Sequence, residues 1–138
     1  MVSRERIYNM TDLFQSINFT SHAGLPLTWK IEMDALSDPE WECIAKMIIS
    51  YEHRSFFKCV GIPTGGTKLA CILNNHATQN PKDPILIVDD VLTTGTSMEK
   101  TKSYEKSFRF VPNVFGWVVF ARFTCPDWVT PLFQMPTS

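Results

Sequence analysis

One stretch of this chain combines hydroxyl side chains with glycine in a way that suits the binding of a phosphate group. The stretch consists of Thr93, Thr94, Gly95, Thr96 and Ser97. Hydroxyl groups donate hydrogen bonds to phosphate oxygens, and the free backbone N–H groups at the start of a helix point toward an anion. Because the stretch is expected to lead from a strand into a helix, its residue types predict a site for a phosphate monoester.

Two acidic residues, Asp89 and Asp90, lie shortly before the hydroxyl-rich stretch. Their carboxylates are able to accept hydrogen bonds from the vicinal hydroxyls of a ribose, either directly or through a hydrated Mg²⁺. Acidic side chains beside a phosphate site therefore predict a sugar phosphate as the ligand. The alternative is that the two aspartates only end a strand and that the Thr and Ser residues only cap the next helix.

Hydrophobic patterning predicts the elements that position these residues. The apolar run from Pro84 to Val88 has the composition of a central parallel strand, which we expect to end at Asp89 and Asp90. Further strands are expected at 58–62, 115–120 and 129–135, and helices at 38–52, at 67–75 and from the hydroxyl-rich stretch to about Phe110. This alternation predicts an α/β fold, in which ligands bind beyond the carboxyl ends of the parallel strands.

The chain as a whole is expected to form a single domain. It has 138 residues and 44% hydrophobic content, enough for one core. Residues 1–36 fit the alternation poorly and are expected to form a small hood, irregular or made of strands, over one end of the sheet, whereas 37–138 form the α/β core. With 13 Lys and Arg against 14 Asp and Glu, no nucleic-acid partner is expected.

The setting expected from the sequence is cytoplasmic. Met1 to Met10 does not have the pattern of a secretory signal, and no stretch is long enough to span a membrane, so no membrane partner is expected. The four cysteines form no C-x-x-C pair. We therefore expect reduced and mostly buried thiols rather than a zinc site or a redox dithiol.

Taken together, residues Ile85 to Ser97 resemble the phosphoribosyl pyrophosphate (PRPP) signature of the type I phosphoribosyltransferases. The resemblance implies a three-layer, Rossmann-like parallel sheet with a hood. It also implies that Asp89 and Asp90 hold the ribose hydroxyls and that Thr93 to Ser97 hold the 5′-phosphate. Mg²⁺ is implied as a cofactor bound mainly through PRPP, with the two aspartates able to reach it through water.

A second loop, Gly61 to Lys68, follows the strand expected at 58–62. It is not a nucleoside triphosphate P-loop, because Thr67 separates Lys68 from the last glycine. It resembles instead the pyrophosphate loop of the same family. That resemblance assigns pyrophosphate binding to Thr64, Gly65, Gly66, Thr67 and Lys68, and it leads us to expect a non-proline cis peptide within Thr64 to Gly66.

Two further segments are similar to the orotate phosphoribosyltransferase branch of that family. Phe19 to Gly24, followed by Trp29 to Asp34, is similar to the N-terminal stretch of that branch, with His22 in place of a lysine. Arg122, after the strand expected at 115–120, resembles the arginine that meets the pyrimidine. The resemblance implies base binding by Arg122 and His22, with orotate among the candidate bases; alternatively, Arg122 is only a solvated surface residue.

One departure from the family leaves two functions open. Only 14 residues run from Cys71 to Pro84, too few for the basic mobile loop that covers the reacting sugar in the family. The chain is therefore expected to be a phosphoribosyltransferase acting on PRPP and a nitrogenous base, or else a PRPP- or nucleotide-binding module with reduced or no turnover. No catalytic residue is assigned, and a homodimer is expected because relatives usually dimerise.

Overall fold

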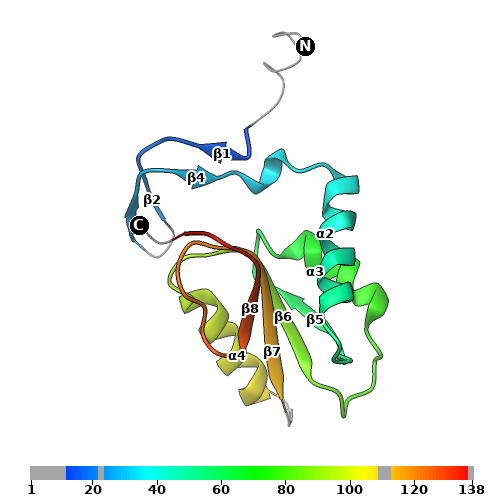
Figure 1. The fold of residues 1–138 in the computed structure, drawn as a ribbon. Coiled ribbons are helices and arrows are strands. Elements are labelled where there is room, and N and C mark those ends of the chain that lie inside the picture. Colours follow the sequence, from blue (N-terminus) through cyan, green and yellow to red (C-terminus); the bar gives the residue numbers. More distant parts are fainter. Residues whose placement is uncertain (1–11, 22–23, 109–112, 137–138) are drawn as a thin grey trace.

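The computed structural model of the protein describes residues 12–21, 24–108 and 113–136. Its centre is a parallel sheet with the strand order β5-β6-β7-β8 (Figure 1). These strands are β5 (Cys59–Gly61), β6 (Ile85–Leu92), β7 (Val114–Ala121) and β8 (Val129–Gln134). The parallel pairing confirms the α/β fold that the alternation of elements predicts.

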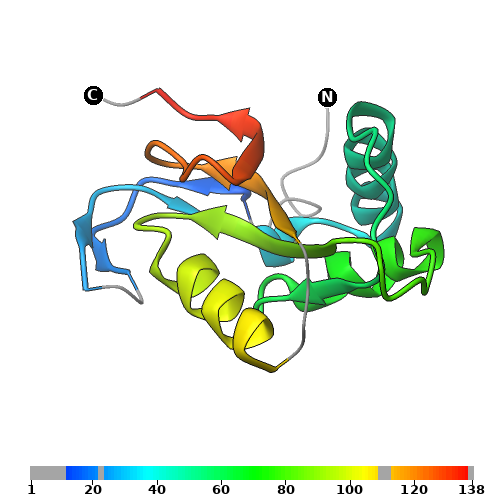
Figure 2. The same ribbon diagram turned by 90° about the horizontal axis from the view of Figure 1, so that it is seen from below.

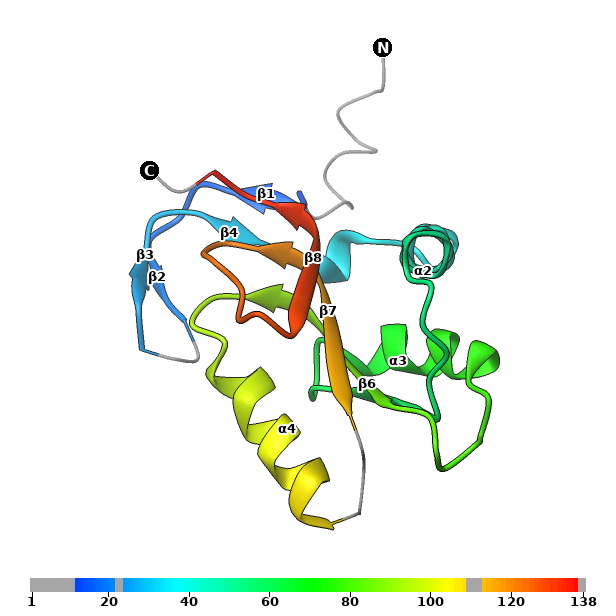
Figure 3. The same ribbon diagram turned by 60° about the horizontal axis from the view of Figure 1, so that its bottom comes forward.

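Helices cover both faces of this sheet, so the core has three layers. Helices α2 (Asp38–Tyr51) and α3 (Thr67–Leu73) lie on one side of β6 and β7, and α4 (Thr96–Phe108) lies on the other (Figures 2 and 3). Leu86 and Val88 face the first pair of helices, whereas Ile85 and Ile87 pack with Met98 of α4. A strand buried on both faces needs apolar residues at successive positions, which is why this run does not alternate with polar residues.

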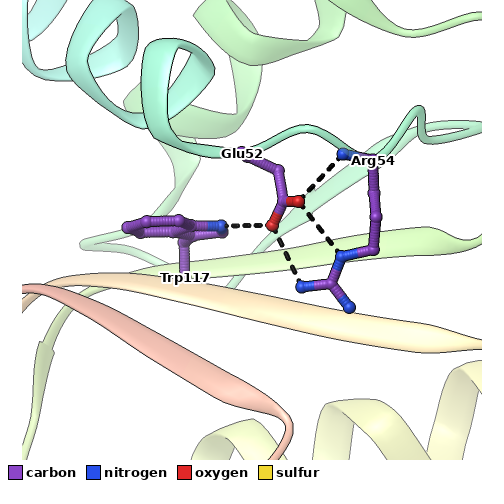
Figure 4. Close-up of polar contacts among 3 residues, drawn as sticks. All are labelled: Glu52, Arg54 and Trp117. Atoms are coloured by element: carbon purple, nitrogen blue, oxygen red, sulfur yellow. Dashed lines mark hydrogen bonds and ion pairs between the residues drawn. The ribbon is translucent and has the colours of Figure 1, made fainter.

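Helix α2 begins at the capping box that the sequence predicts. The Ser37 hydroxyl accepts a hydrogen bond from the backbone N–H of Glu40, and Glu40 Oε1 accepts one from the backbone N–H of Ser37 at 2.9 Å. After the helix, Glu52 accepts hydrogen bonds from Trp117 Nε1 at 2.9 Å and from the Arg54 guanidinium (Figure 4). This bond links the end of α2 to the middle of β7.

The hood consists of two small antiparallel ladders. Strand β1 (Phe14–Gln15) pairs with β4 (Lys30–Ile31), and β2 (Phe19–Thr20) pairs with β3 (Pro26–Leu27). A 3-10 turn, η1 (Met33–Ala35), then leads into α2. In Figure 1 the β1–β4 pair lies over the end of the sheet where β6 and β7 finish.

Several element boundaries differ from those expected from the sequence. Strand β6 does not end at Asp89 and Asp90 but runs through them to Leu92, because β7 continues alongside and Asp89 pairs with Val118. Helix α3 ends at Leu73 and is followed by a 3-10 turn, η2 (Asn74–His76). The expected end of α4 near Phe110 falls at residues outside the described ranges.

The cysteines are free, as expected, but they are not mostly buried. Cys59 is buried in β5, whereas Cys43 and Cys71 are exposed and Cys125 is half-buried. Cys43 and Cys71 lie on the outer sides of α2 and α3, where an apolar side chain is tolerated singly. Within the ranges that the structure describes, no helix is long and apolar enough to cross a membrane.

Candidate functional site

A cleft of about 380 Å³ lies between the hood and the carboxyl end of β6. Four parts of the chain line it: the hood, the loop after β5, the end of β6 with the following loop, and the residue after β7. Its lining includes Phe19, Lys30, Glu32, Asp34, Thr64, Gly65, Asp89, Asp90, Thr93, Thr94, Gly95, Thr96, Ser97 and Arg122. The tertiary structure thus gathers residues that are far apart in the sequence at one end of the sheet.

The hydroxyl-rich stretch forms a tight turn at the start of α4. Gly95 has φ +81°, a left-handed conformation that glycine adopts without strain. The hydroxyls of Thr94 and Thr96 are 2.9 Å apart, and Thr94 Oγ1 accepts a hydrogen bond from the N–H of Thr96 at 3.3 Å. All five residues from Thr93 to Ser97 line the cleft. The loop therefore presents hydroxyl groups and the positive end of a 13-residue helix to the same space.

Asp89 and Asp90 lie side by side in β6 and both line the cleft. Asp89 Oδ1 accepts a hydrogen bond from the backbone N–H of Asp90 at 2.8 Å, and Asp90 Oδ1 accepts one from the N–H of Val91 at 2.7 Å. Burial, followed by the hydrogen bond and negative charge of Asp90, raises the pKa of Asp89 to about 8. The raised pKa favours the protonated form of the Asp89 carboxyl when the cleft holds no cation or other positively charged group.

The loop after β5 delivers only part of the predicted pyrophosphate site to the cleft. Thr64 and Gly65 line it, and the structure has a cis peptide bond between Pro63 and Thr64, one residue before the expected range. Gly65 lies directly against the carboxylate of Asp90, so that even a Cβ atom at this position would overlap it. The absence of a side chain at Gly65 is therefore what allows the loop and the aspartate pair to share one cavity.

Gly66 and Thr67 do not line the cleft. The N–H of Gly66 donates to Ile62 O at 2.8 Å, and the N–H of Thr67 donates to Thr64 O at 3.2 Å. A Cβ on Gly66 would lie only 2.5 Å from Val88 O, so the glycine is needed for close packing of the loop on β6. These two residues shape the loop, and their N–H groups are already engaged within the protein.

Lys68 is also turned away from the cleft. Its Nζ forms an ion pair with Asp38 Oδ1 at 2.6 Å, at the start of α2. Both side chains are more than half exposed, so the pair lies on the surface. The sequence places Lys68 in the loop predicted to bind pyrophosphate, but Lys68 lies in the first turn of α3 and its side chain is directed toward the neighbouring helix α2.

Arg122 is buried at the edge of the cleft and is not a solvated surface residue. It is only 5% exposed, and its Nη1 donates a hydrogen bond to Trp29 O at 2.6 Å. Its guanidinium lies over the Trp29 ring at 3.6 Å and near the Phe19 ring at 5.9 Å, while its Nε has no partner in the described part of the chain. Burial lowers the pKa of Arg122. His22, the other predicted base-binding residue, lies outside the described residues.

Three charged residues of the hood that the sequence analysis did not assign to the site also line the cleft. They are Lys30, Glu32 and Asp34. Lys30 Nζ forms an ion pair with Glu32 Oε2 at 2.9 Å, and Glu32 Oε1 accepts a hydrogen bond from the N–H of Asp34. The only signal in the sequence was the loose resemblance of 29–34, which named no role for these side chains.

The cleft has the oxygen donors that Mg²⁺ prefers, but too few to hold the ion alone. Within the described residues there is no group of three or more His, Cys, Asp and Glu side chains arranged for a metal. Asp89 and Asp90 supply carboxylates at one wall of the cleft. Because Mg²⁺ usually keeps waters and binds through one or two carboxylates and substrate phosphates, the pair fits an ion that arrives with a phosphorylated ligand.

Comparisons with known proteins agree with this architecture. No family model matches the chain, and no curated protein matches its sequence. Solved structures do match: orotate phosphoribosyltransferase from Aeropyrum pernix superimposes with a TM-score of 0.70 over 88% of each chain at 18% identity. The same enzyme of Mycobacterium tuberculosis, in complex with Fe(III) dicitrate, gives 0.66 over 94% of this chain and 92% of that one at 14% identity.

Leishmania donovani UMP synthase matches with a TM-score of 0.66 at 16% identity, and 89% of this chain spans 33% of that protein. The chain therefore has the fold of the type I phosphoribosyltransferases, as the segment from Ile85 to Ser97 predicts. These structural neighbours are similar to this chain in fold and have little sequence in common with it.

Proposed function

We propose that this protein binds PRPP and transfers its phosphoribosyl group to a nitrogenous base, releasing pyrophosphate. The observation that carries the proposal is the shared cleft, in which the hydroxyl-rich loop, the aspartate pair and the Gly65 loop face one another. PRPP carries a 5′-phosphate, a pair of ribose hydroxyls and a diphosphate on one sugar. Its binding therefore needs these three kinds of protein group close together. The likeness in fold to the orotate phosphoribosyltransferases supports the same function.

Each wall of the cleft has a role in this proposal. Thr93 to Ser97 bind the 5′-phosphate, Asp89 and Asp90 accept hydrogen bonds from the ribose hydroxyls, and Thr64 and Gly65 approach the diphosphate. Arg122 faces the base. Orotate is the leading candidate base, because its carboxylate and carbonyl oxygens suit a guanidinium donor.

In the reaction, the bond between C1′ of the ribose and the diphosphate oxygen breaks, and its electron pair leaves with pyrophosphate. A ring nitrogen of the base forms the new bond at C1′ with inversion and gives up its proton to solvent. Positive charge develops on the sugar ring meanwhile, and the negative charge of the aspartate pair beside it stabilises that charge. Asp89 and Asp90 would hold, through water, a Mg²⁺ ion that arrives with PRPP, and that ion would offset the negative charge of the leaving pyrophosphate.

A second candidate function is ligand binding without turnover, and a specific observation favours it. The connection between η2 and β6, residues 77–84, contributes nothing to the lining of the cleft. It runs along the end of the sheet opposite the hood (Figure 1). This connection therefore does not cover the reacting sugar or exclude water from it, as a lid does in many transferases. A module of this kind would sense PRPP or a nucleoside monophosphate.

One assay separates the two candidates. The protein is incubated with PRPP, Mg²⁺ and each of orotate, uracil, adenine, hypoxanthine and guanine, and pyrophosphate release is followed. Release that depends on one base supports the transferase. No release with any base, combined with PRPP binding in calorimetry, supports the binding module.

The Thr94→Ala variant tests the location of the site for both candidates. It removes a hydroxyl from the phosphate loop while leaving Gly95 and the start of α4 in place. We expect PRPP affinity to fall by roughly tenfold, the effect of losing a hydrogen bond to a charged group. Thr130→Ala, at an exposed position of the edge strand β8, is the matched control. Equal affinity in the wild type and in Thr94→Ala would place the site elsewhere.

A further inference from the structure

The diphosphate part of the proposed site lacks a cation from its own loop. Lys68, the lysine that the sequence offers for this purpose, is paired with Asp38 outside the cleft. The N–H groups of Gly66 and Thr67 are engaged in bonds within the loop. Two described residues, Thr64 and Gly65, remain, and they bring no charge to a group that carries several negative charges.

Only two cationic side chains line the cleft among the described residues, Lys30 and Arg122. Arg122 is fixed, because its Nη1 is bonded to Trp29 O and its guanidinium is stacked on the Trp29 ring. The carboxylates along the walls are those of Glu32, Asp34 and the aspartate pair. Apart from any Mg²⁺ that arrives with it, a diphosphate entering this cleft therefore meets more negative than positive charge from the described side chains unless a mobile cation turns toward it.

Lys30 is the residue that is able to turn. Its side chain is 38% exposed, and the atom that holds it is a carboxylate oxygen of Glu32 in the same strand region, 2.9 Å away. The Glu32 side chain is 21% exposed, and a partly exposed ion pair of this kind contributes little to stability. The flexible four-carbon stem of lysine allows the ammonium group to exchange one anionic partner for another at small cost.

We propose that Lys30 leaves Glu32 when PRPP binds and pairs with its diphosphate group, so that a hood lysine performs the task that the sequence assigns to Lys68. The inference depends on the proposed function, because it concerns the same ligand and the same cleft. In this arrangement Glu32 is an internal competitor that holds Lys30 in the absence of ligand. The hood, rather than a lid, supplies the mobile charge.

Calorimetry with three probes tests this proposal: PRPP, inorganic pyrophosphate and ribose 5-phosphate, each with Mg²⁺. For Lys30→Met we expect affinity for PRPP and pyrophosphate to fall roughly tenfold, as for the loss of one hydrogen bond between charged groups. Affinity for ribose 5-phosphate, which has no diphosphate, should change by less than about twofold. Lys30→Arg should restore most of the loss, because it keeps the charge.

Two further variants distinguish this role from a general effect of charge. Glu32→Gln should strengthen PRPP binding by about twofold to fivefold, because it removes the competing anion, and the gain should vanish when Lys30→Met is also present. Lys68→Met should leave PRPP binding unchanged. Thermal unfolding of every variant establishes that it folds.

Each possible outcome decides the question. If Lys30→Met binds PRPP as tightly as the wild type, or loses affinity for ribose 5-phosphate equally, the proposal is wrong. If Lys68→Met shows the diphosphate-specific loss instead, the sequence-based assignment is right and the proposal is again wrong. If the wild type binds neither PRPP nor ribose 5-phosphate, the proposed function itself is wrong. If the wild type binds both and Lys30→Met binds them equally well, only this inference is wrong.

Discussion

Replacing Asp89 by Asn should change how the stability of the protein depends on pH. The Asp89 carboxyl has its pKa raised to about 8, first by burial and then by the hydrogen bond and charge of Asp90. In the unfolded chain the same carboxyl titrates near its ordinary pKa of 3.8. Between these two values the folded protein keeps a proton that the unfolded chain has lost, so the free energy of unfolding decreases as the pH rises.

The size of the effect follows from this difference in bound protons. One proton of difference changes the free energy of unfolding by about 1.4 kcal/mol per pH unit. From pH of about 5.5 to about 7.5 the wild type should therefore lose roughly 3 kcal/mol that Asp89→Asn does not lose. For a chain of this size that corresponds to a relative shift in the melting temperature of roughly 10 °C.

Thermal and urea unfolding at several pH values, with EDTA present to remove divalent cations, measures this difference. Asp127→Asn is the matched control, since Asp127 is exposed and lies outside the cleft. The melting temperatures of wild type and Asp127→Asn should fall together as the pH rises toward 8, while that of Asp89→Asn falls less. Parallel curves for Asp89→Asn and the wild type would refute the argument that the folded state holds this proton.

Three further predictions concern stability and the position of the hood. Gly66→Ala should lower the free energy of unfolding by about 1–3 kcal/mol, because the new methyl group would press on the carbonyl oxygen of Val88. Urea unfolding measures this change, and an unchanged midpoint of the urea transition would contradict the packing. Glu52→Ala should lower the free energy of unfolding by about 1–3 kcal/mol, because the indole N–H of Trp117, which is only 5% exposed, loses its acceptor. Unfolding monitored by tryptophan fluorescence measures this loss, and a curve that matches the wild type would contradict the bond. Arg122→Lys should loosen the hood, because lysine cannot keep both the stacking on the Trp29 ring and the hydrogen bond to Trp29 O. The change should appear as faster amide hydrogen exchange in β4 than in the wild type. Equal exchange rates would show that Arg122 does not hold the hood.

Much of the core was predictable from local patterns. The apolar runs that became β6 and β7 are buried on both faces, and such runs are legible because every position must be apolar. The capping box at Ser37 marks the start of α2 for an equally local reason. The end of β6 was not predictable, because its continuation through Asp89 and Asp90 depends on pairing with β7, a strand that lies later in the chain.

The site shows the same division. The residues from Thr93 to Ser97 were predicted to form a phosphate loop from their types and order, and all five line the cleft. The two lysines were not distinguishable in this way. Lys68 stands beside a glycine loop but points to Asp38, whereas Lys30 lies in a stretch whose resemblance assigned it no role and yet lines the cleft. Which side of a helix or strand faces a cavity depends on packing against other elements.

The sequence by itself determined the α/β core, the hydroxyl-rich loop and the aspartate pair, because each is encoded by neighbouring residues whose chemistry is local. Only the tertiary structure decided which charges meet across the cleft. It brought Trp29 of the hood onto Arg122 after β7, set Gly65 against Asp90, and placed Lys30 on the wall of the site. Such contacts arise when distant segments pack together, and no spacing along the chain specifies them.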